Sequence, residues 1–289
     1  MKVLVFGGSG FLGSYLVDEL KKNKFEITVA DIVIPQYECE FIKCDITNQN
    51  DIKDIFRKNF DIVYNLAGFA NLDDAIENPL KTLELNTIAN TQIIENCLKH
   101  KVKKYLYASS TYAMSEKGSF YGISKLASEK IIEEYHKING LNFIIIRYGS
   151  VYSEMKFYNN YIYNLVEEAV KNNEINHNGS GEEFREYIHA KDAAKLSVDI
   201  LNDNKYLNKH VTLTGSQGIK RIDLFNMINE ILGDKLKIIL KKNIKTNHYK
   251  YTPYSFQPSI SIKLSPNPQI DIGQGILECV RKAHYDKNK

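Results

Sequence analysis

The stretch VLVFGGSGFLGSYLVDEL, at residues 3–20, decides the expected fold of this chain. A short apolar run is followed by glycines at GxxGxxG spacing and then by apolar residues at helical spacing. Glycine allows a tight turn and lets backbone N–H groups approach a pyrophosphate, and the start of the following helix favours the anion. The stretch therefore predicts a strand, a dinucleotide-binding turn and a helix; a glycine-rich structural turn is the alternative. The residues expected to contact the dinucleotide here are Gly7, Gly10, Phe11, Leu12 and Gly13.

The first half of the chain alternates short apolar runs with segments of helical spacing. Such runs suit strands that are buried on both faces of a parallel sheet. Their alternation with helices predicts an α/β fold, a doubly wound parallel sheet of the Rossmann type, with the loops after the strands on one ligand-binding rim. The expected strands are 3–6, 26–31, 40–45, 61–68, 103–110 and 143–149, and the expected helices are 11–22, 51–59, 79–99 and 121–138.

The pattern changes after Gly149, where Tyr and Asn become frequent. We expect the later segments to build a smaller C-terminal lobe, with the substrate between that lobe and the rim of the sheet. The predicted boundaries are 1–150 plus about 188–214 for the dinucleotide-binding Rossmann domain, and 151–187 plus 215–289 for the substrate-binding lobe. Expected within them are helices near 158–172, 190–203, 221–232 and 272–284, a strand at 210–215, an alternating segment at 236–240 and a Pro-containing stretch at 252–268.

Composition is that of an ordinary globular protein. The chain has 289 residues, of which 43% are apolar and 25% charged, and this excludes disordered, collagen-like and low-complexity classes. No apolar run approaches the roughly 20 residues needed to span a bilayer, and the first run is too short for a signal peptide. The four cysteines form no CxxC pair, so we expect reduced thiols and a cytoplasmic location.

Charges and histidines indicate neither nucleic-acid binding nor a metal site. The net charge is +3, from 38 basic and 35 acidic residues, which gives no general attraction to nucleic acid or to an anionic membrane. Six lysines fall within residues 235–250, where we expect a solvated face rather than a nucleic-acid stripe. The seven histidines form no HxxxH or HExxH pair, so we expect no metal.

Asp31 ends the second expected strand, close to the offset of about 20 residues at which an acidic residue contacts the adenosine ribose in dinucleotide-binding folds. A carboxylate there accepts hydrogen bonds from both ribose hydroxyls and repels a 2′-phosphate. NAD is therefore favoured over NADP as the cofactor, and the absence of arginine from DIVIPQ at residues 31–36 weakens the case for NADP. The alternative is that Asp31 only caps a turn.

Tyr121 and Lys125 form a YxxxK motif at the start of a helical segment, so phenol and ammonium share one face of the helix. A free tyrosine has a pKa near 10 and is a poor base at neutral pH. A nearby ammonium and the positive charge of an oxidised nicotinamide favour the phenolate, which makes Tyr121 a candidate general base or acid. Ser109 and Ser110 end the fifth expected strand on the same rim, where a hydroxyl can orient a substrate oxygen. The alternative is a tyrosine–lysine pair on a solvated helix.

With these residues the chain resembles an extended short-chain dehydrogenase/reductase of the nucleotide-sugar epimerase and dehydratase type, over nearly its whole length. Four further stretches carry the resemblance. They are Cys44-Asp45-Ile46, Asn65-Leu66-Ala67-Gly68, Asn86-Thr87 with the following NTQIIENC, and FREYIHAKDAA at 184–194.

The resemblance implies roles for particular residues. Ser110 is implied to be the catalytic Ser/Thr, Tyr121 the proton carrier, and Lys125 both a group that lowers the pKa of Tyr121 and a ribose contact. Arg185 is implied to hold the phosphate of a nucleotide sugar, and the resemblance also implies a homodimer. Asp45 is implied to meet the adenine, with Ile46, Leu66, Ala67 and Gly68 as further cofactor contacts; Ser109 and Thr111 are the substrate contacts expected beside Ser110.

The chain also departs from the family pattern. Sugar-nucleotide 4,6-dehydratases carry Thr-Asp-Glu where this chain has Ser110-Thr111-Tyr112, so dehydration is not expected. Only 11 positions separate Ser110 from Tyr121, which implies a short loop beside the substrate pocket. The expected YGP appears as Tyr152-Ser153-Glu154, and these differences leave the sugar open.

The preferred hypothesis is an NAD-dependent nucleotide-sugar epimerase that acts through a transient 4-keto sugar. If the ketone is released, the enzyme is a nucleotide-sugar 4-dehydrogenase, and in the reverse direction it is a ketosugar reductase. A protein of another class, a non-catalytic NAD-sensing regulator, is less expected because a sensor has no need of a proton carrier.

Overall fold

A computed structural model describes residues 1–288 apart from 158, 242–247 and 252–260. Its largest element is an eight-stranded sheet in the order β13-β10-β6-β5-β4-β1-β2-β3, in which all the neighbouring strands run parallel. This strand order confirms the predicted doubly wound parallel sheet. The strands are β1 (Lys2–Phe6), β2 (Glu26–Asp31), β3 (Glu40–Lys43), β4 (Ile62–Asn65), β5 (Lys104–Ser110), β6 (Phe143–Tyr148), β10 (Lys209–Leu213) and β13 (Ile262–Leu264).

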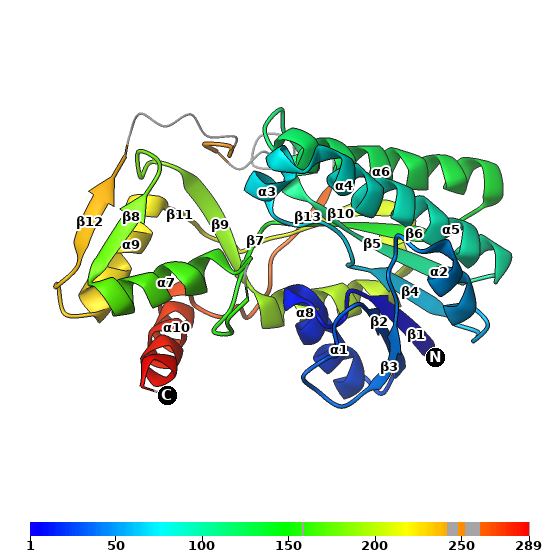
Figure 1. Ribbon diagram of the computed structural model, residues 1–289, viewed down its shortest axis with the longest axis horizontal. Helices are drawn as coiled ribbons and strands as arrows, with labels where there is room; N and C mark the ends of the chain where they lie inside the picture. The colour runs from blue at the N-terminus through cyan, green and yellow to red at the C-terminus, as the bar shows by residue number, and fades with distance from the viewer. Residues whose placement is uncertain (158, 242–247, 252–260, 289) are drawn as a thin grey trace.

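Helices cover both faces of this sheet (Figure 1). The apolar run of β1 shows why: Val3 and Val5 belong to one buried cluster, Leu4 and Phe6 to the other, and all four are 0% exposed. One face packs against α1 (Phe11–Lys22) and α8 (Ala190–Asp199), with the short η3 (Ile200–Asn202) and η4 (Asn204–Tyr206) after it. The other packs against α2 (Gln49–Ile55), α5 (Ala89–Lys99) and α6 (Ser119–Asn139).

The helix expected at 79–99 is interrupted. It consists of α4 (Pro79–Leu83), a π-helical turn η1 (Glu84–Ile88) and α5. Two elements that the sequence did not predict precede the main helices on this side of the sheet, α3 (Leu72–Glu77) and the 3-10 turn η2 (Thr111–Met114). Both are too short to show an apolar period.

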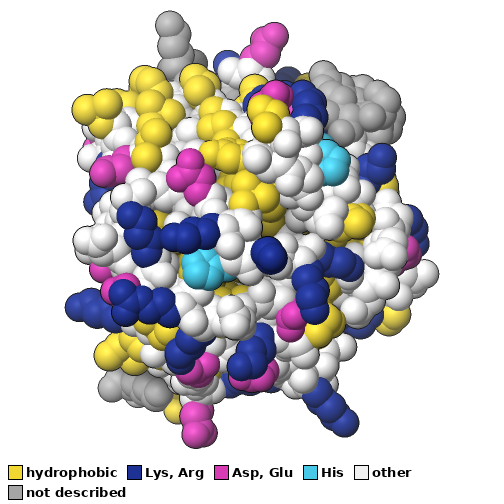
Figure 2. Space-filling view, turned by 90° about the vertical axis from the view of Figure 1, so that its right-hand side faces the viewer, with side chains coloured by type: hydrophobic (Ala, Val, Ile, Leu, Met, Phe, Trp, Pro, Cys, Tyr) yellow, Lys and Arg dark blue, Asp and Glu magenta, His cyan; other side chains and the backbone are white. Residues whose placement is uncertain are grey.

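Several large apolar side chains of this helical layer are exposed. Hydrophobic side chains gather toward the top of the face in Figure 2, the side on which α4 and α6 lie in Figure 1. The exposed members from α4, η1 and α6 are Leu80 (83%), Ile88 (55%), Phe120 (37%), Ile123 (59%), Leu126 (41%) and Ile138 (71%).

The smaller lobe lies at the left of Figure 1 and has its own buried cluster. A three-stranded sheet joins β7 (Ser150–Tyr152), β9 (Phe184–His189) and β11 (Gly218–Lys220), and a parallel pair joins β8 (Glu174–His177) to β12 (Lys237–Leu240). The helices of this lobe are α7 (Tyr161–Asn172), α9 (Arg221–Ile231) and α10 (Ile272–Lys287).

The chain returns to the large sheet late. β13 pairs with β10 although it lies in the range 215–289 that the sequence assigns to the smaller lobe. A strand of three residues beside a Pro-containing stretch leaves no periodic signal. Residues 242–247 of the lysine-rich segment and 252–260 of the Pro-containing stretch lie outside the described residues. Among the helices of the described ranges, none has the length and hydropathy that crossing a membrane requires.

Candidate active site

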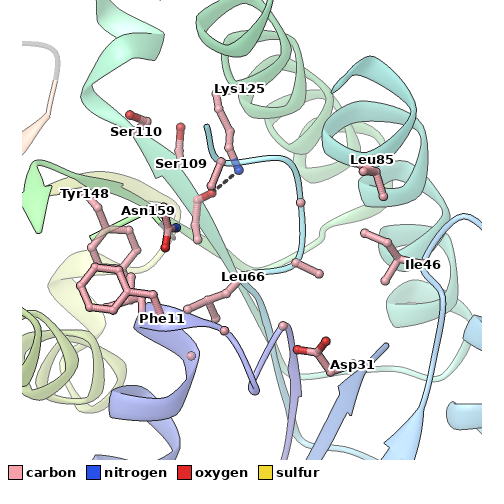
Figure 3. A pocket seen from close by; sticks show the side chains of 18 of the residues that line it. Phe11, Asp31, Ile46, Leu66, Leu85, Ser109, Ser110, Lys125, Tyr148 and Asn159 are labelled. Atoms are coloured by element: carbon pink, nitrogen blue, oxygen red, sulfur yellow. Dashed lines mark hydrogen bonds between the residues drawn. The ribbon is translucent and has the colours of Figure 1, made fainter. Parts of the chain in front are cut away.

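A cleft of about 460 Å³ opens where the strands of the large sheet end. Figure 3 places Asp31 toward one end, and Ser110 with Lys125 toward the other. Ser109 also lines this cleft, together with Ser110. The residues expected to contact the cofactor all line it: Gly7, Gly10, Phe11, Leu12, Gly13, Asp31, Asp45, Ile46, Leu66, Ala67, Gly68, Tyr121 and Lys125.

The glycine turn after β1 has the close packing that a dinucleotide site needs. Gly7 has φ +78°, and a Cβ there would lie 2.6 Å from the backbone N of Ala67. A Cβ on Gly13 would lie 2.1 Å from the carbonyl oxygen of Gly7. The N-cap of α1 is Gly10, which has no side chain to cap the first N–H groups of the helix. These free donors and the open backbone fit a pyrophosphate group.

Asp31 closes the turn from the second strand. Its carboxylate accepts a hydrogen bond from the backbone N of Ser9 at 3.0 Å and another from the backbone N of Val33 at 3.1 Å. These contacts fix the carboxylate at the end of β2 while it lines the cleft. It is therefore placed to accept hydrogen bonds from the hydroxyl groups of a ribose.

Ser110, Tyr121 and Lys125 meet where β5 ends and α6 begins. Both Ser110 and Tyr121 line the cleft, and Ser110 Oγ accepts a hydrogen bond from the backbone N of Tyr112 at 3.3 Å. The Nζ atom of Lys125 lies 6.0 Å from the centre of the Tyr121 ring and donates a hydrogen bond to the carbonyl oxygen of Ala108 at 2.8 Å (Figure 3). Lys125 is 6% exposed, so its ammonium approaches the cleft from the protein interior.

Burial shifts the pKa of both titratable members. It raises the pKa of Tyr121, and the hydrogen bond from Ser110 acts in the opposite direction. Burial lowers the pKa of Lys125 to about 8, against the attraction of Glu129. The role of Lys125 in lowering the pKa of Tyr121, which the resemblance implies, stays a prediction.

Ser109 lines the cleft, but its hydroxyl points to the interior. It donates a hydrogen bond to Glu129 Oε1 at 2.6 Å. Glu129 in turn forms an ion pair with Arg147 on β6, with Nε–Oε1 at 2.8 Å and Nη2–Oε2 at 2.6 Å. Ser109 therefore supports the ion pair that joins α6 to the sheet.

Thr111 and Arg185 are not among the described residues that line this cleft. Thr111 is buried, and its hydroxyl lies 3.3 Å from the hydroxyl of Tyr249. Arg185 stacks on the Tyr249 ring with its Cζ at 4.1 Å from the ring centre, and it donates hydrogen bonds to the carbonyl oxygens of Phe184, Tyr249 and Lys250. Both therefore contact the segment around Tyr249, which joins the two lobes.

Tyr112 extends this junction. Its ring centre lies 6.0 Å from that of Tyr121 and 4.6 Å from that of Tyr249. Its hydroxyl lies 2.6 Å from His248 Nδ1. Tyr112 thus joins the segment around Tyr249 to the end of the cleft that holds Tyr121.

A second polar cluster lies behind the cleft. His189 Nδ1 accepts a hydrogen bond from the backbone N of Lys191 at 3.2 Å, so its proton is on Nε2, which donates to Glu154 at 3.0 Å. Lys191 Nζ also bonds to Glu154, at 2.8 Å. Glu154, His189 and Glu278 could each offer a metal ligand atom within 4.8 Å of the others. However, Glu154 already accepts hydrogen bonds from His189 Nε2 and from Lys191 Nζ.

Several residues that line the cleft were not predicted. Tyr148 ends β6, Gly149 follows it and Val151 lies in β7, so the rule that strand ends meet at one rim could have found them. Leu85 and Asn159 come from a π-helical turn and a loop, and no local pattern marks them. The remaining missed residues are Ala30, Ile32, Cys44, Ala70 and Ala108.

Residues 3–213 match the model of the NAD dependent epimerase/dehydratase family. A curated relative, a putative UDP-glucose 4-epimerase from Methanocaldococcus jannaschii, is 26% identical over 302 residues, a match that covers 96% of this chain and 97% of the relative.

Solved structures of similar fold include two epimerases. A UDP-glucose 4-epimerase from Thermotoga maritima with UDP-glucose has a TM-score of 0.85 at 21% identity, covering 99% of this chain and 100% of the other. A UDP-glucuronic acid 4-epimerase from Bacillus cereus, in complex with UDP-glucuronic acid and NAD, has a TM-score of 0.86 at 21% identity and covers 99% of both chains. At this identity the likeness supports the fold alone.

Proposed function

Because the chain belongs to the NAD-dependent epimerase/dehydratase family, whose members are enzymes of nucleotide sugars, we propose that it is a nucleotide-sugar epimerase that acts through a transient 4-keto sugar. The observation that carries this proposal is that Ser110, Tyr121 and Lys125 line the same cleft as the glycine turn and Asp31. NAD, when bound, supplies a reversible hydride acceptor.

The residues that would hold NAD are those of the cleft. The N–H groups at the start of α1 would face the pyrophosphate, and the Asp31 carboxylate would accept hydrogen bonds from the hydroxyls of the adenosine ribose. Asp45 and Ile46, which also line the cleft, would flank the adenine. Lys125 would contact the second ribose from the interior.

Tyr121 carries the proton in the proposed reaction. Its phenolate oxygen takes the proton of the sugar hydroxyl at carbon 4, and Ser110 holds that oxygen by a hydrogen bond. Lys125 carries a positive charge beside the pair, because its pKa of about 8 leaves it mainly protonated at neutral pH. The hydride of carbon 4 would be held by the bound cofactor while the keto sugar rotates in the site. Return of the hydride to the opposite face, with the proton returned by Tyr121, would invert the configuration at carbon 4.

The sugar nucleotide would lie between the rim and the smaller lobe. We propose that Arg185 faces its phosphate, exchanging backbone carbonyl acceptors for phosphate oxygens of similar hydrogen-bonding chemistry. The exposed apolar side chains of α4, η1 and α6 support a homodimer through that helical layer.

Incubation with UDP-, GDP-, CDP- and dTDP-sugars tests the proposal. The absorbance of NADH and the NMR spectrum of the products are followed together. Formation of an isomer without net NADH is the expected result. Stoichiometric NADH would instead indicate a 4-dehydrogenase, and its consumption with a ketosugar a reductase. Firm NAD binding with no conversion of any sugar would favour a non-catalytic sensor.

A further inference from the structure

Arg221 lies within electrostatic reach of Glu183 but has no ion-pair partner within 4 Å among the described residues. It begins α9 directly after β11, and its Cζ lies 3.8 Å above the centre of the Tyr161 ring. Its Nε and Nη1 atoms are buried and have no hydrogen-bond partner among the described residues. An uncompensated buried guanidinium is costly, so a protein retains one where a ligand completes the pair.

The ladder between β11 and β9 places Arg221 beside other donors. Ile219 pairs with Arg185, so these two side chains share one face of the sheet. Arg221 lies two residues beyond Ile219, and its backbone N bonds to the carbonyl oxygen of Glu183, which continues the ladder. Tyr187 lies two residues beyond Arg185 on the same face, is 9% exposed, and has a buried hydroxyl with no partner among the described residues.

The nearby carboxylates are already engaged. Glu183 accepts hydrogen bonds from His177 Nε2 at 3.0 Å and from the backbone N atoms of Ser180 and Gly181. Glu186 forms an ion pair with Lys263 at 2.7 Å. Arg185, in contrast to Arg221, donates its side-chain hydrogen bonds to backbone carbonyl oxygens.

These unused donors face the side of the lobe that meets the catalytic end of the sheet. Tyr112, whose ring centre is 6.0 Å from that of Tyr121, lies within electrostatic reach of both Arg185 and Arg221. Tyr187 and Arg221 are also close enough to interact electrostatically. An anion bound by Arg221 and Tyr187 would therefore lie near Tyr112, whose ring is next to that of Tyr121.

We propose that Arg221 and Tyr187 form a binding site for an anionic group of the substrate. This inference rests on the proposed function and adds a residue that the sequence motifs do not mark. Two groups share the required chemistry, a diphosphate of the nucleotide and a carboxylate on the sugar ring. A guanidinium can contact either of them at two points.

Calorimetric titration without turnover tests this site. The ligands are UDP, UDP-glucose, UDP-glucuronic acid and inorganic pyrophosphate, and the proteins are the wild type, Arg221→Gln and Arg221→Lys. If the site takes the diphosphate, Arg221→Gln should weaken UDP, UDP-glucose and pyrophosphate by about tenfold to a hundredfold. If it takes a carboxylate, only UDP-glucuronic acid should weaken. Arg221→Lys should restore part of the loss, since it keeps the charge without the planar fork.

The outcomes separate this site from the proposed function. Wild-type dissociation constants in Arg221→Gln for every ligand would overturn the site, as would a wild type that binds none of the four. Binding of pyrophosphate that depends on Arg221, in a protein that converts no nucleotide sugar, would keep the site and remove the proposed function. The unfolding midpoint of each variant shows whether it is folded.

Discussion

Two arginines with buried guanidinium nitrogens, Arg147 in the large sheet and Arg221 in the smaller lobe, lie in opposite electrostatic settings. Arg147 is 4% exposed and bonds to Glu129 at two points, with its Nε at 2.8 Å and its Nη2 at 2.6 Å from the carboxylate oxygens. Arg221 stacks on Tyr161 and has no carboxylate partner among the described residues. The large sheet thus balances its buried charge internally, whereas the smaller lobe leaves charge for a ligand.

The position of the paired arginine explains why the pairing matters. Glu129 lies on α6, the helix that also carries Tyr121 and Lys125, and Arg147 lies on β6. Their ion pair, with Ser109 as a further donor, holds this helix on the sheet. The catalytic end is therefore preorganised before any substrate arrives, and this gives the comparison its first test.

The largest expected effect is on stability. Glu129→Gln should lower the free energy of unfolding by about 3–5 kcal/mol, because it leaves Arg147 buried without a charged partner. Denaturant unfolding at neutral pH measures the change. Arg221→Gln is the matched variant and should stay within about 1 kcal/mol of the wild type, since it removes a charge that has no partner to lose. Equal losses in the two variants would show that both arginines are balanced alike.

A smaller effect is expected on the chemical step. Tyr121→Phe should reduce turnover by at least about 100-fold, or roughly 2.7 kcal/mol of activation free energy, because it removes the proton carrier. The variant should still bind NAD. Tyr107→Phe is the control, since the Tyr107 ring also lies near Lys125, at 4.8 Å from Nζ, but outside the residues that line the cleft.

Variants in the large sheet and in the smaller lobe should change different kinetic constants. Tyr121→Phe should lower kcat, whereas Arg221→Gln should raise KM, since the first acts on the proton and the second on binding. A turnover of Tyr121→Phe equal to that of the wild type would remove this tyrosine from the mechanism. A loss of equal size in Tyr107→Phe would trace the effect to the surroundings of Lys125 instead.

The two regions also differ in how far the sequence predicts them. The turn from Gly7 to Gly13 can be recognised from the spacing of its glycines. Gly13 packs against the carbonyl oxygen of Gly7, which is only six residues earlier in the chain. The apolar runs of the large sheet likewise have a local signal, and their order follows from right-handed crossovers. The Rossmann fold and most of the residues that line the cleft were therefore predictable.

The smaller lobe depends on contacts between distant residues. Arg221 lies two residues beyond Ile219, the partner of Arg185, only because the three-residue strand β11 pairs with β9, and a run that short has no periodic pattern. Tyr249 reaches Thr111 across 138 positions of sequence. The phosphate role expected of Arg185 was visible as a motif, but the hydrogen bonds that commit its guanidinium to backbone carbonyls were not.

Acid pH should affect the boundary between the two regions. Glu154 follows β7 of the smaller lobe and bonds to His189 at the end of β9 and to Lys191 on α8. Burial alone would raise the pKa of Glu154, but the hydrogen bonds from His189 and Lys191 lower it to about 2, against an ordinary value of 4.5. Between these values the unfolded chain binds more protons than the folded one, so this stabilisation is complete above the ordinary pKa and disappears as pH falls toward 2.

Unfolding of the wild type and Glu154→Gln at pH 5 and pH 3 measures this contribution. The wild type should lose about 2 kcal/mol more than the variant across that interval, because only the wild type must protonate a carboxylate held by His189 and Lys191. The sign matters, since a buried carboxyl without these partners would have a raised pKa and would gain stability on acidification. Parallel losses in the two proteins would mean that Glu154 is solvated like a surface carboxylate and that the boundary is held by apolar packing alone.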